Sequence, residues 1–412
     1  MRHDCYYFSR LFCYKGETVM KKLVFLTLAL CCAAALAFAG GGQAAGTSAT
    51  AGTTGTSSGD TVSIGAVFPL SGQVAFYGNE SRDGALLAIE QINAAGGLLG
   101  KKLNLLAEDD EGDGAKSVNA FTKLTTRDKV SFVIGSSTSG ATMAMTSLAQ
   151  QNKVVLCSPS ATNIDVTKAG DFIFRACFID PFQGVVGADF AYDTLKSRKA
   201  AILYDAGADY NTGLAASFRD EFKKVGGQIV ADEAYQTGDV DFNAQVTHIR
   251  AAAPDVVYLP NYYNDVALQA KQLRAQGITC ALVGGDGWDS LIDNAGDEAL
   301  NGFWSAGFAA DTTDPKGADF VKAYQARFNK PASQFAALGY DSLMLIIDGI
   351  KAAGSFDTSK VKDAMAKING PYVTGNIRFD ASRNPIKGAA ILEIVRKDGK
   401  LVNAYKTTVN PK

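Results

Sequence analysis

Apolar and polar positions from residue 61 onward alternate between two periods. Short β-branched runs predict strands, and the segments between them carry apolar residues at helical spacing. In the segment 80–93, for example, Leu86, Ile89 and Ile92 fall on one stripe. The expected strands of this first series are 61–68, 103–108, 130–134 and 154–158, and the expected helices are 80–93, 115–127 and 140–151.

The same rhythm restarts after position 180. The expected strands are 200–204, 229–235, 256–259 and 281–283, and the expected helices are 211–224, 242–253 and 265–276. Repeated strand–helix units predict parallel sheets that are covered by helices on both faces. Two such series predict an α/β protein with two doubly wound parallel-sheet lobes.

The chain changes character beyond about position 311. It is expected to be mostly helical to 369, with long patterns at 319–328 and 335–353, and then to form strands near 377–379, 390–396 and 401–408. Helices without strands of their own must pack on an existing sheet. We therefore expect the chain to return to the first lobe and to cross once more to the second. The predicted limits are 61–178 with 309–382 for lobe 1, and 179–308 with 383–412 for lobe 2.

The segment before these units predicts export. Lys21 and Lys22 precede an apolar run, 23–39, which ends in small residues, as in a secretory signal peptide. A membrane-spanning helix is the alternative, but the run is short for a bilayer. We assign residues 1–39 to the export signal and expect Met20 to be the true start. The Gly, Ala, Ser and Thr-rich stretch 40–60 predicts a flexible linker.

Cysteines raise two further questions. Lipidation at Cys31 or Cys32 would make the protein a lipoprotein, but Leu30 stands where a small residue is expected, so this is the less favoured alternative. The expected lobes contain Cys157, Cys177 and Cys280, whose spacing matches no metal motif. We expect buried thiols, and a disulfide between Cys157 and Cys177 stays open as the alternative.

Composition and motifs argue against several function classes. The chain of 412 residues has 40 Lys and Arg against 42 Asp and Glu, without a block of like charge, which disfavours nucleic acid and anionic membranes as partners. Only two histidines occur, His3 and His248, so a Ser-His-Asp or Cys-His site lacks its parts. Residues 69–72 lack the dinucleotide fingerprint, and 109–114 only half resembles a calcium loop. We expect no catalytic residue, cofactor or metal.

The chemistry that is present gathers after the strands. Ligands of open α/β sheets bind beyond the carboxyl ends of the strands. Residues 135–142 are small and polar and lead into a helix, whose start favours an anion. Hydroxyls follow in 158–162, and the second series supplies Tyr210, Tyr262 and Asp286. Together these residues describe a pocket for a zwitterion with an apolar end.

Several segments resemble a known family. The stretch 64–72 (IGAVFPLSG), the pair Tyr77-Gly78, the run 84–97 (GALLAIEQINAAGG), the loop 158–162 (SPSAT) and the segment 339–341 (GYD) are similar to the periplasmic leucine/isoleucine/valine-binding protein family. The resemblance spans about 62–401. It implies a type I periplasmic binding protein fold, in which a hinge of three crossovers joins the lobes, and service to a branched-chain amino acid ABC transporter.

The resemblance also implies residue roles. Ser139 would hold the ligand carboxylate, Thr162 would touch both ends of the zwitterion, and the backbone carbonyl of Ser160 would accept from the ammonium group. Asp286, which is often Glu in the family, would pair with the ammonium. The remaining expected pocket residues are Tyr77, Tyr210, Tyr262 and Phe335, with Trp288 nearby. The positions of a first-lobe disulfide found in many members are here Gly112 and Thr138.

We therefore expect a monomeric solute-binding protein outside the cytoplasm, in the periplasm or its equivalent. It would close on a small amino acid, which we expect to be branched-chain, and deliver it to a membrane permease. One alternative is the same fold with an aliphatic amide, urea or another amino acid as ligand, and another is a sensory receptor component. A third is an enzyme that uses the cleft between the lobes, although the sequence lacks the catalytic residues such an enzyme needs.

Overall fold

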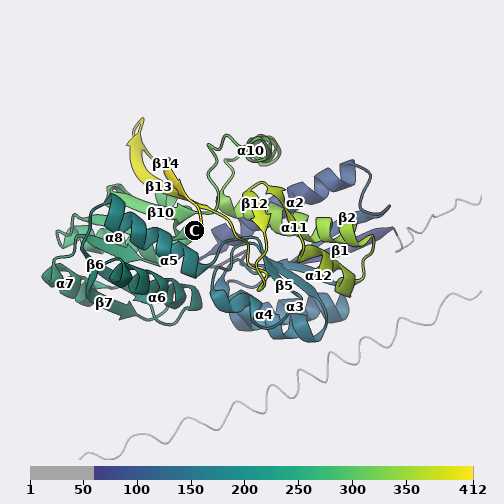
Figure 1. Cartoon of the computed structure of the whole chain (residues 1–412), viewed down its shortest axis with the longest axis horizontal. Helices are drawn as coiled ribbons and strands as arrows, with labels where there is room; N and C mark the ends of the chain where they lie inside the picture. The colour runs from purple at the N-terminus through teal and green to yellow at the C-terminus, as the bar shows by residue number, and fades with distance from the viewer. Residues whose placement is uncertain (1–59, 412) are drawn as a thin grey trace, which may run out of the picture. The chain divides into compact units, whose positions relative to one another are not determined.

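The computed structural model describes residues 60–411, so the predicted export signal and nearly all of the predicted linker lie outside the described residues. The first sheet has the strand order β2-β1-β3-β4-β5, and all its pairings are parallel (Figure 1). Its central strands are buried along their whole length, which explains why they appear in the sequence as unbroken apolar runs. The strands are β1 (Thr61–Phe68), β2 (Lys102–Asp109), β3 (Phe132–Gly135), β4 (Val155–Ser158) and β5 (Ile173–Arg175).

Helices from two distant parts of the chain cover this sheet. The first part supplies α2 (Ala75–Ala94), α3 (Gly114–Thr122) with the π-turn η1 (Lys123–Arg127), α4 (Ser139–Gln151) and the short η2 (Ile164–Thr167). The later part supplies α10 (Pro315–Phe328), α11 (Gln334–Ala353) and α12 (Thr358–Met365), followed by a hairpin of β11 (Asn369–Tyr372) and β12 (Gly375–Arg378). Ile346 and Ile347 of α11 belong to the same buried cluster as Val133 and Leu156 of the sheet, so the chain does return to the first lobe.

The second sheet has the strand order β14-β13-β10-β9-β8-β6-β7. It is parallel from β7 to β10, and β13 and β14 extend it as an antiparallel edge. Asp398 and Gly399 join these last two strands in a tight turn, and both have positive φ, as such hairpins require. The strands are β6 (Lys199–Asp205), β7 (Gln228–Tyr235), β8 (Val256–Leu259), β9 (Ala281–Gly284), β10 (Gly302–Ala306), β13 (Ala389–Lys397) and β14 (Lys400–Val409).

Helices before and between these strands complete the second lobe. They are α5 (Asp180–Asp189) with η3 (Phe190–Thr194), α6 (Asp209–Lys224), α7 (Asn243–Ala252), α8 (Tyr263–Ala275), and the short η4 (Asp286–Trp288), α9 (Leu291–Asn294) and η5 (Asp297–Ala299). The chain passes between the two sheets after β5, after β10 and after β12, which gives the three crossovers of the expected fold. The exact residue limits of the lobes stay a prediction.

Most predicted elements are confirmed, and β1 and β8 match their predicted limits. The strand predicted near 377–379 overlaps β12, and the prediction missed β5, α5, β10 and β11. The strand β5 has three residues, too few for a period to show. The helix α5 contains Pro181, Gly184 and Gly187, which weaken a helical pattern, although proline in the first turn costs no hydrogen bond.

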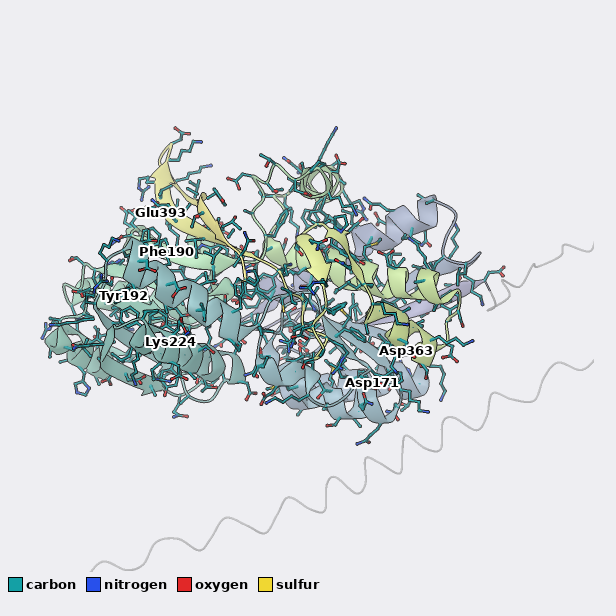
Figure 2. All side chains as sticks on the ribbon, viewed as in Figure 1. Asp171, Phe190, Tyr192, Lys224, Asp363 and Glu393 are labelled. Atoms are coloured by element: carbon teal, nitrogen blue, oxygen red, sulfur yellow. The ribbon has the colours of Figure 1, made fainter. Side chains whose placement is uncertain are left out.

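Charged side chains cover the surface in pairs of opposite sign. Lys362 lies 2.8 Å from Asp171 in the turn before β5 and 2.6 Å from Asp363 on α12, and Figure 2 labels both acids. Such exposed pairs contribute little stability. Cys157 and Cys177 are free buried thiols, so the open alternative of a disulfide does not hold in this structure. Between residues 60 and 411, no helix combines the length and apolarity that crossing a membrane requires.

Candidate functional site

A small enclosed cavity lies where loops after strands of both sheets meet. It brings together most of the predicted ligand-binding residues, which come from sequence positions more than 250 residues apart. Its walls are one carboxylate, serine hydroxyls and aromatic rings. The lining residues are Tyr77, Ser137, Ser139, Ser160, Tyr210, Tyr262, Asp286, Gly287 and Phe335.

The first-lobe wall of the cavity is suited to an anion. Ser139 is the first residue of α4, where backbone N–H groups have no partner within the helix. The backbone N–H of Asn163 donates to the Ser139 hydroxyl at 3.2 Å, which leaves the hydroxyl proton to donate elsewhere. The Ser160 hydroxyl donates to the carbonyl of Ser137 at 2.8 Å and so closes this wall. Donors at a helix start attract negative charge.

The second-lobe wall carries a buried negative group, Asp286. Its side chain is only 4% exposed and accepts a hydrogen bond from Nε2 of Gln183 at 3.1 Å. Burial raises the pKa of Asp286 to about 6, and hydrogen bonds from Gln183 and Tyr210 offset only part of this effect. A cation brought next to the carboxylate would favour its ionised form. The cavity therefore offers anion donors on one side and a carboxylate on the other.

Aromatic rings form the rest of the wall in two stacked pairs. The Tyr77 and Phe335 rings stack with centroids 4.2 Å apart, and the Tyr210 and Tyr262 rings stack at 5.0 Å. The Tyr77 hydroxyl donates to the carbonyl of Gly287 at 2.6 Å, so a first-lobe ring is bonded to the loop that carries Asp286. The faces of these rings suit an apolar ligand group. The Tyr77 hydroxyl does not interfere, because it is already bonded to the carbonyl of Gly287.

The enclosed space is narrow. Its volume is about 10 Å³, close to the room that one water molecule needs. An amino acid is far larger, so its entry requires the two walls to move apart. Because the walls belong to different lobes, that movement is a motion of one lobe relative to the other.

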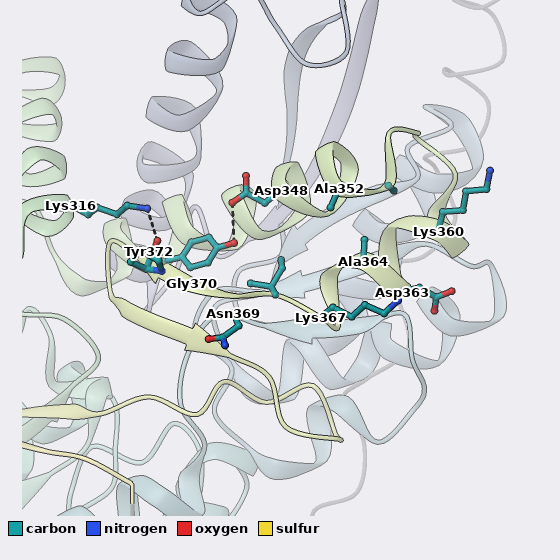
Figure 3. A pocket seen from close by; sticks show the side chains of 13 residues that line it. Lys316, Asp348, Ala352, Lys360, Asp363, Ala364, Lys367, Asn369, Gly370 and Tyr372 are labelled. Atoms are coloured by element: carbon teal, nitrogen blue, oxygen red, sulfur yellow. Dashed lines mark hydrogen bonds between the residues drawn. The ribbon is translucent and has the colours of Figure 1, made fainter.

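A second concavity, of about 780 Å³, is a wide groove between α11, α12 and the β11 strand (Figure 3). Two hydrogen bonds join residues of its wall: Lys316 donates to the carbonyl of Pro371 at 2.6 Å, and the Tyr372 hydroxyl donates to Asp348 at 3.0 Å. The groove is open and lies away from the carboxyl ends of the strands. We therefore take the small interlobe cavity as the candidate site, although the groove is larger.

Comparisons with known proteins agree with this geometry. The family model described as periplasmic binding protein matches residues 61–400. The chain belongs to the periplasmic binding protein family. A "Leucine-, isoleucine-, valine-, threonine-, and alanine-binding protein" of Pseudomonas aeruginosa is 32% identical over 323 residues, which cover 78% of this chain and 86% of the relative. The "Leu/Ile/Val-binding protein homolog 3" of Brucella melitensis is 34% identical over 304 residues, covering 72% and 81% of the two chains.

Two solved structures of the family resemble the fold closely. The substrate-binding protein LivJ of a branched-chain amino acid transporter from Streptococcus pneumoniae, in complex with isoleucine, is 36% identical with a TM-score of 0.78, and the match covers 85% of this chain and 100% of that one. The leucine-binding protein LivK of Thermotoga maritima is 30% identical with a TM-score of 0.80, covering 85% and 99%. The fold is therefore that of the type I periplasmic binding proteins.

Two residues that we predicted for the site of this family member do not line the cavity. Trp288 is 1% exposed, and its indole N–H donates to the carbonyl of Leu259 at 2.9 Å, within the apolar core of the second lobe. Thr162 is equally buried, and its carbonyl accepts from the backbone N–H of Asp180 at 2.9 Å. The other seven predicted residues all line the cavity.

Sequence reasoning missed three residues at the site: Ser137, Gly287 and, behind Asp286, Gln183. Ser137 lay within the polar loop 135–142 and could have been chosen. Gly287 contributes backbone, and Gln183 lies 103 positions from its partner, so neither carries a local signal.

A second buried carboxylate, Asp180, lies behind the cavity wall. Neither of its oxygens has a partner with good hydrogen-bond geometry among the described residues. Burial raises the pKa of Asp180 to about 8, and the side chains of Thr162 and Gln183 offset only part of the effect. Asp180 is therefore largely neutral at pH 7.

Proposed function

We propose that the protein is an extracytoplasmic solute-binding protein that captures an amino acid with a small, branched apolar side chain by hinge closure. It would then deliver this ligand to the permease of an ABC transporter. One observation carries the proposal: a single closed cavity places the start of α4 with Ser139 opposite Asp286, between two stacked aromatic pairs.

Each part of the ligand has a matching group. The carboxylate would accept hydrogen bonds from Ser139 and from the free N–H groups at the start of α4. The ammonium would pair with Asp286 and donate to the backbone carbonyl of Ser160. The side chain would lie between the rings, where each buried methylene contributes about 0.8 kcal/mol. Thr162, behind this wall, would contact the ligand only if the loop 158–162 shifts during closure.

The relatives support the ligand class. The names of two of them include leucine, isoleucine and valine, and a third is solved with isoleucine. A neutral amide or urea in the same fold would leave Asp286 without an opposite charge, and a buried carboxylate without a partner is costly. A zwitterion is therefore the better match to this site.

The proposal includes no catalysis. The named relatives are binding proteins, one of them the substrate-binding protein of a transporter, and the cavity lining contains no histidine. His248 lies on α7 with its ring 3.3 Å from Glu233, exposed to solvent. Export by the signal that we predict in residues 1–39 would bring the protein to its permease; we propose a monomer.

A ligand screen tests the function. Thermal denaturation would be measured with each of the common amino acids, acetamide, urea and buffer alone. We expect leucine, isoleucine and valine to raise the melting temperature most, since a ligand at a hundred times its Kd stabilises by about 2.7 kcal/mol. Calorimetry and recovery of unchanged ligand would follow. A response to neutral amides alone would refute the amino-acid assignment, and ligand consumption would refute the binding-protein assignment.

A further inference from the structure

We infer that Gln183 is a positioning residue for ligand capture, whose side-chain amide holds the Asp286 carboxylate towards the cavity. The inference rests on the proposed function, in which Asp286 pairs with the ligand ammonium. Gln183 lies outside the cavity lining, so it would act on the ligand through Asp286.

The side-chain amide of Gln183 is hydrogen-bonded to both the carboxylate and the backbone N–H of Asp286. Its Nε2 donates to Oδ1 of Asp286 at 3.1 Å, and its Oε1 accepts from the backbone N–H of the same residue at 2.6 Å. Two contacts to one residue fix the carboxylate relative to its own backbone. Gln183 is fully buried on α5, so surrounding atoms hold the amide in place.

A third hydrogen bond sets which way the amide points. The Ser305 hydroxyl donates to the same Oε1 atom at 2.8 Å. Reversing the amide would place an NH₂ group against two donors and leave the carboxylate facing an oxygen. The observed orientation therefore keeps an N–H group directed at Asp286.

The surroundings of Asp286 make this N–H important. The titratable groups that face it are Asp180 of α5, Tyr210 of α6, Tyr258 of β8, Tyr262 before α8, Tyr77 of α2 and Cys177 of the first crossover. None of these is a cation. Until an ammonium arrives, the carboxylate depends on two neutral side-chain donors, Gln183 and Tyr210, and Gln183 is the one that also accepts from the backbone N–H of Asp286.

The test combines Gln183→Leu, Asp286→Asn and the double variant in a thermodynamic cycle, with leucine as the probe in calorimetry at pH 7.5. We expect Gln183→Leu to weaken leucine binding roughly ten- to a hundredfold, as expected for loss of a hydrogen bond to a charged group. In the Asp286→Asn background, the same change should cost less than threefold, because the carboxylate on which Gln183 acts is gone.

Gln269→Leu is the matched control. Gln269 is a fully buried glutamine of the same lobe, on α8, and accepts from Asn261 at 2.8 Å without a contact to Asp286. It should lower the melting temperature but change leucine affinity less than threefold. If Gln183→Leu does not fold, Gln183→Asn keeps the amide but is one methylene too short for both contacts and should show the same loss.

A second measurement follows the carboxyl carbon of Asp286 by NMR in the ligand-free protein during a pH titration. Gln183→Leu should raise the pKa of Asp286, whereas Gln269→Leu should leave it unchanged. Equal losses of affinity in both backgrounds, or an unchanged Asp286 pKa, would overturn the inference. If wild type binds none of the branched-chain amino acids, the proposed function fails, and the titration still decides the role of Gln183.

Discussion

Binding of an amino acid at the cavity should release a proton from Asp286 in mildly acidic solution. Burial holds the pKa of this carboxyl at about 6 in the ligand-free protein. The protonated form is neutral and cannot pair with an ammonium, so affinity must fall as the pH drops through 6. The ionised fraction is about 97% at pH 7.5 and about 9% at pH 5 for such a group, which gives a loss of affinity of about tenfold.

The variant Asp286→Asn tests whether the fall in affinity at low pH comes from protonation of Asp286. The change keeps the size of the side chain and removes the charge. Leaving the ligand ammonium unpaired should cost about 2–5 kcal/mol at pH 7.5, or roughly thirtyfold to several thousandfold in affinity. The variant should also lose the dependence on pH between 5 and 7.5. The pKa of Asp180 is about 8, above this window, and Asp289, whose pKa burial raises to about 7, titrates in wild type and variant alike, so the difference between the two proteins reports on Asp286.

Calorimetry in two buffers of different ionisation enthalpy measures both quantities with leucine as ligand. At pH 5.5, the wild type should release about 0.8 proton per ligand bound and the variant almost none. A wild type that releases no proton, or a variant that loses less than threefold in affinity, would show that Asp286 is only a turn residue between two glycines.

Three further outcomes follow from contacts outside the ligand anchor. Asp180→Asn should raise the melting temperature far more at pH 9 than at pH 4. A buried acid with a folded pKa of about 8 binds its proton more tightly than in the unfolded chain, so stability falls as pH rises from about 4 to about 8, and the amide removes that loss. Tyr263→Phe removes the hydrogen bond of 2.8 Å from the Tyr263 hydroxyl in the second lobe to the carbonyl of Gln73 in the first. Stopped-flow measurements should show faster release of leucine, with an affinity roughly two- to tenfold weaker, whereas the melting temperature of the ligand-free protein should not change. Trp288→Phe loses the bond to Leu259, and denaturant unfolding should show lower stability with leucine affinity kept within threefold; a large loss of affinity would return Trp288 to the ligand site.

The alternation of strands and helices could be predicted because β3 and β4 are fully buried apolar runs and the segments 80–93 and 115–127 carry apolar residues at helical spacing. Short elements such as β5 could not, because three residues hold no period. At the site, the rule that ligands bind beyond strand ends and the family resemblance together found residues in the first turns of helices and in the loops after strands. Trp288 was misplaced because a tryptophan beside Asp286 can turn into the core as readily as into the cavity, and only packing decides. The role of Gln183 could not be predicted, because its contact with Asp286 joins residues 103 positions apart and forms only when the lobe folds.

Under the proposed function, the site would select ligands through closure as much as through contact. Tyr77 reaches the second lobe through its bond to the carbonyl of Gly287, and the same ring stacks on Phe335 to form one wall. A side chain too large for the space between the rings would keep this bond from forming, even if Ser139 and Asp286 still held the ends of the zwitterion. Such a ligand would bind the open lobes and fail to close them. Size discrimination should therefore appear mainly in the closing step, and a permease that recognises the closed form would not receive the wrong ligand.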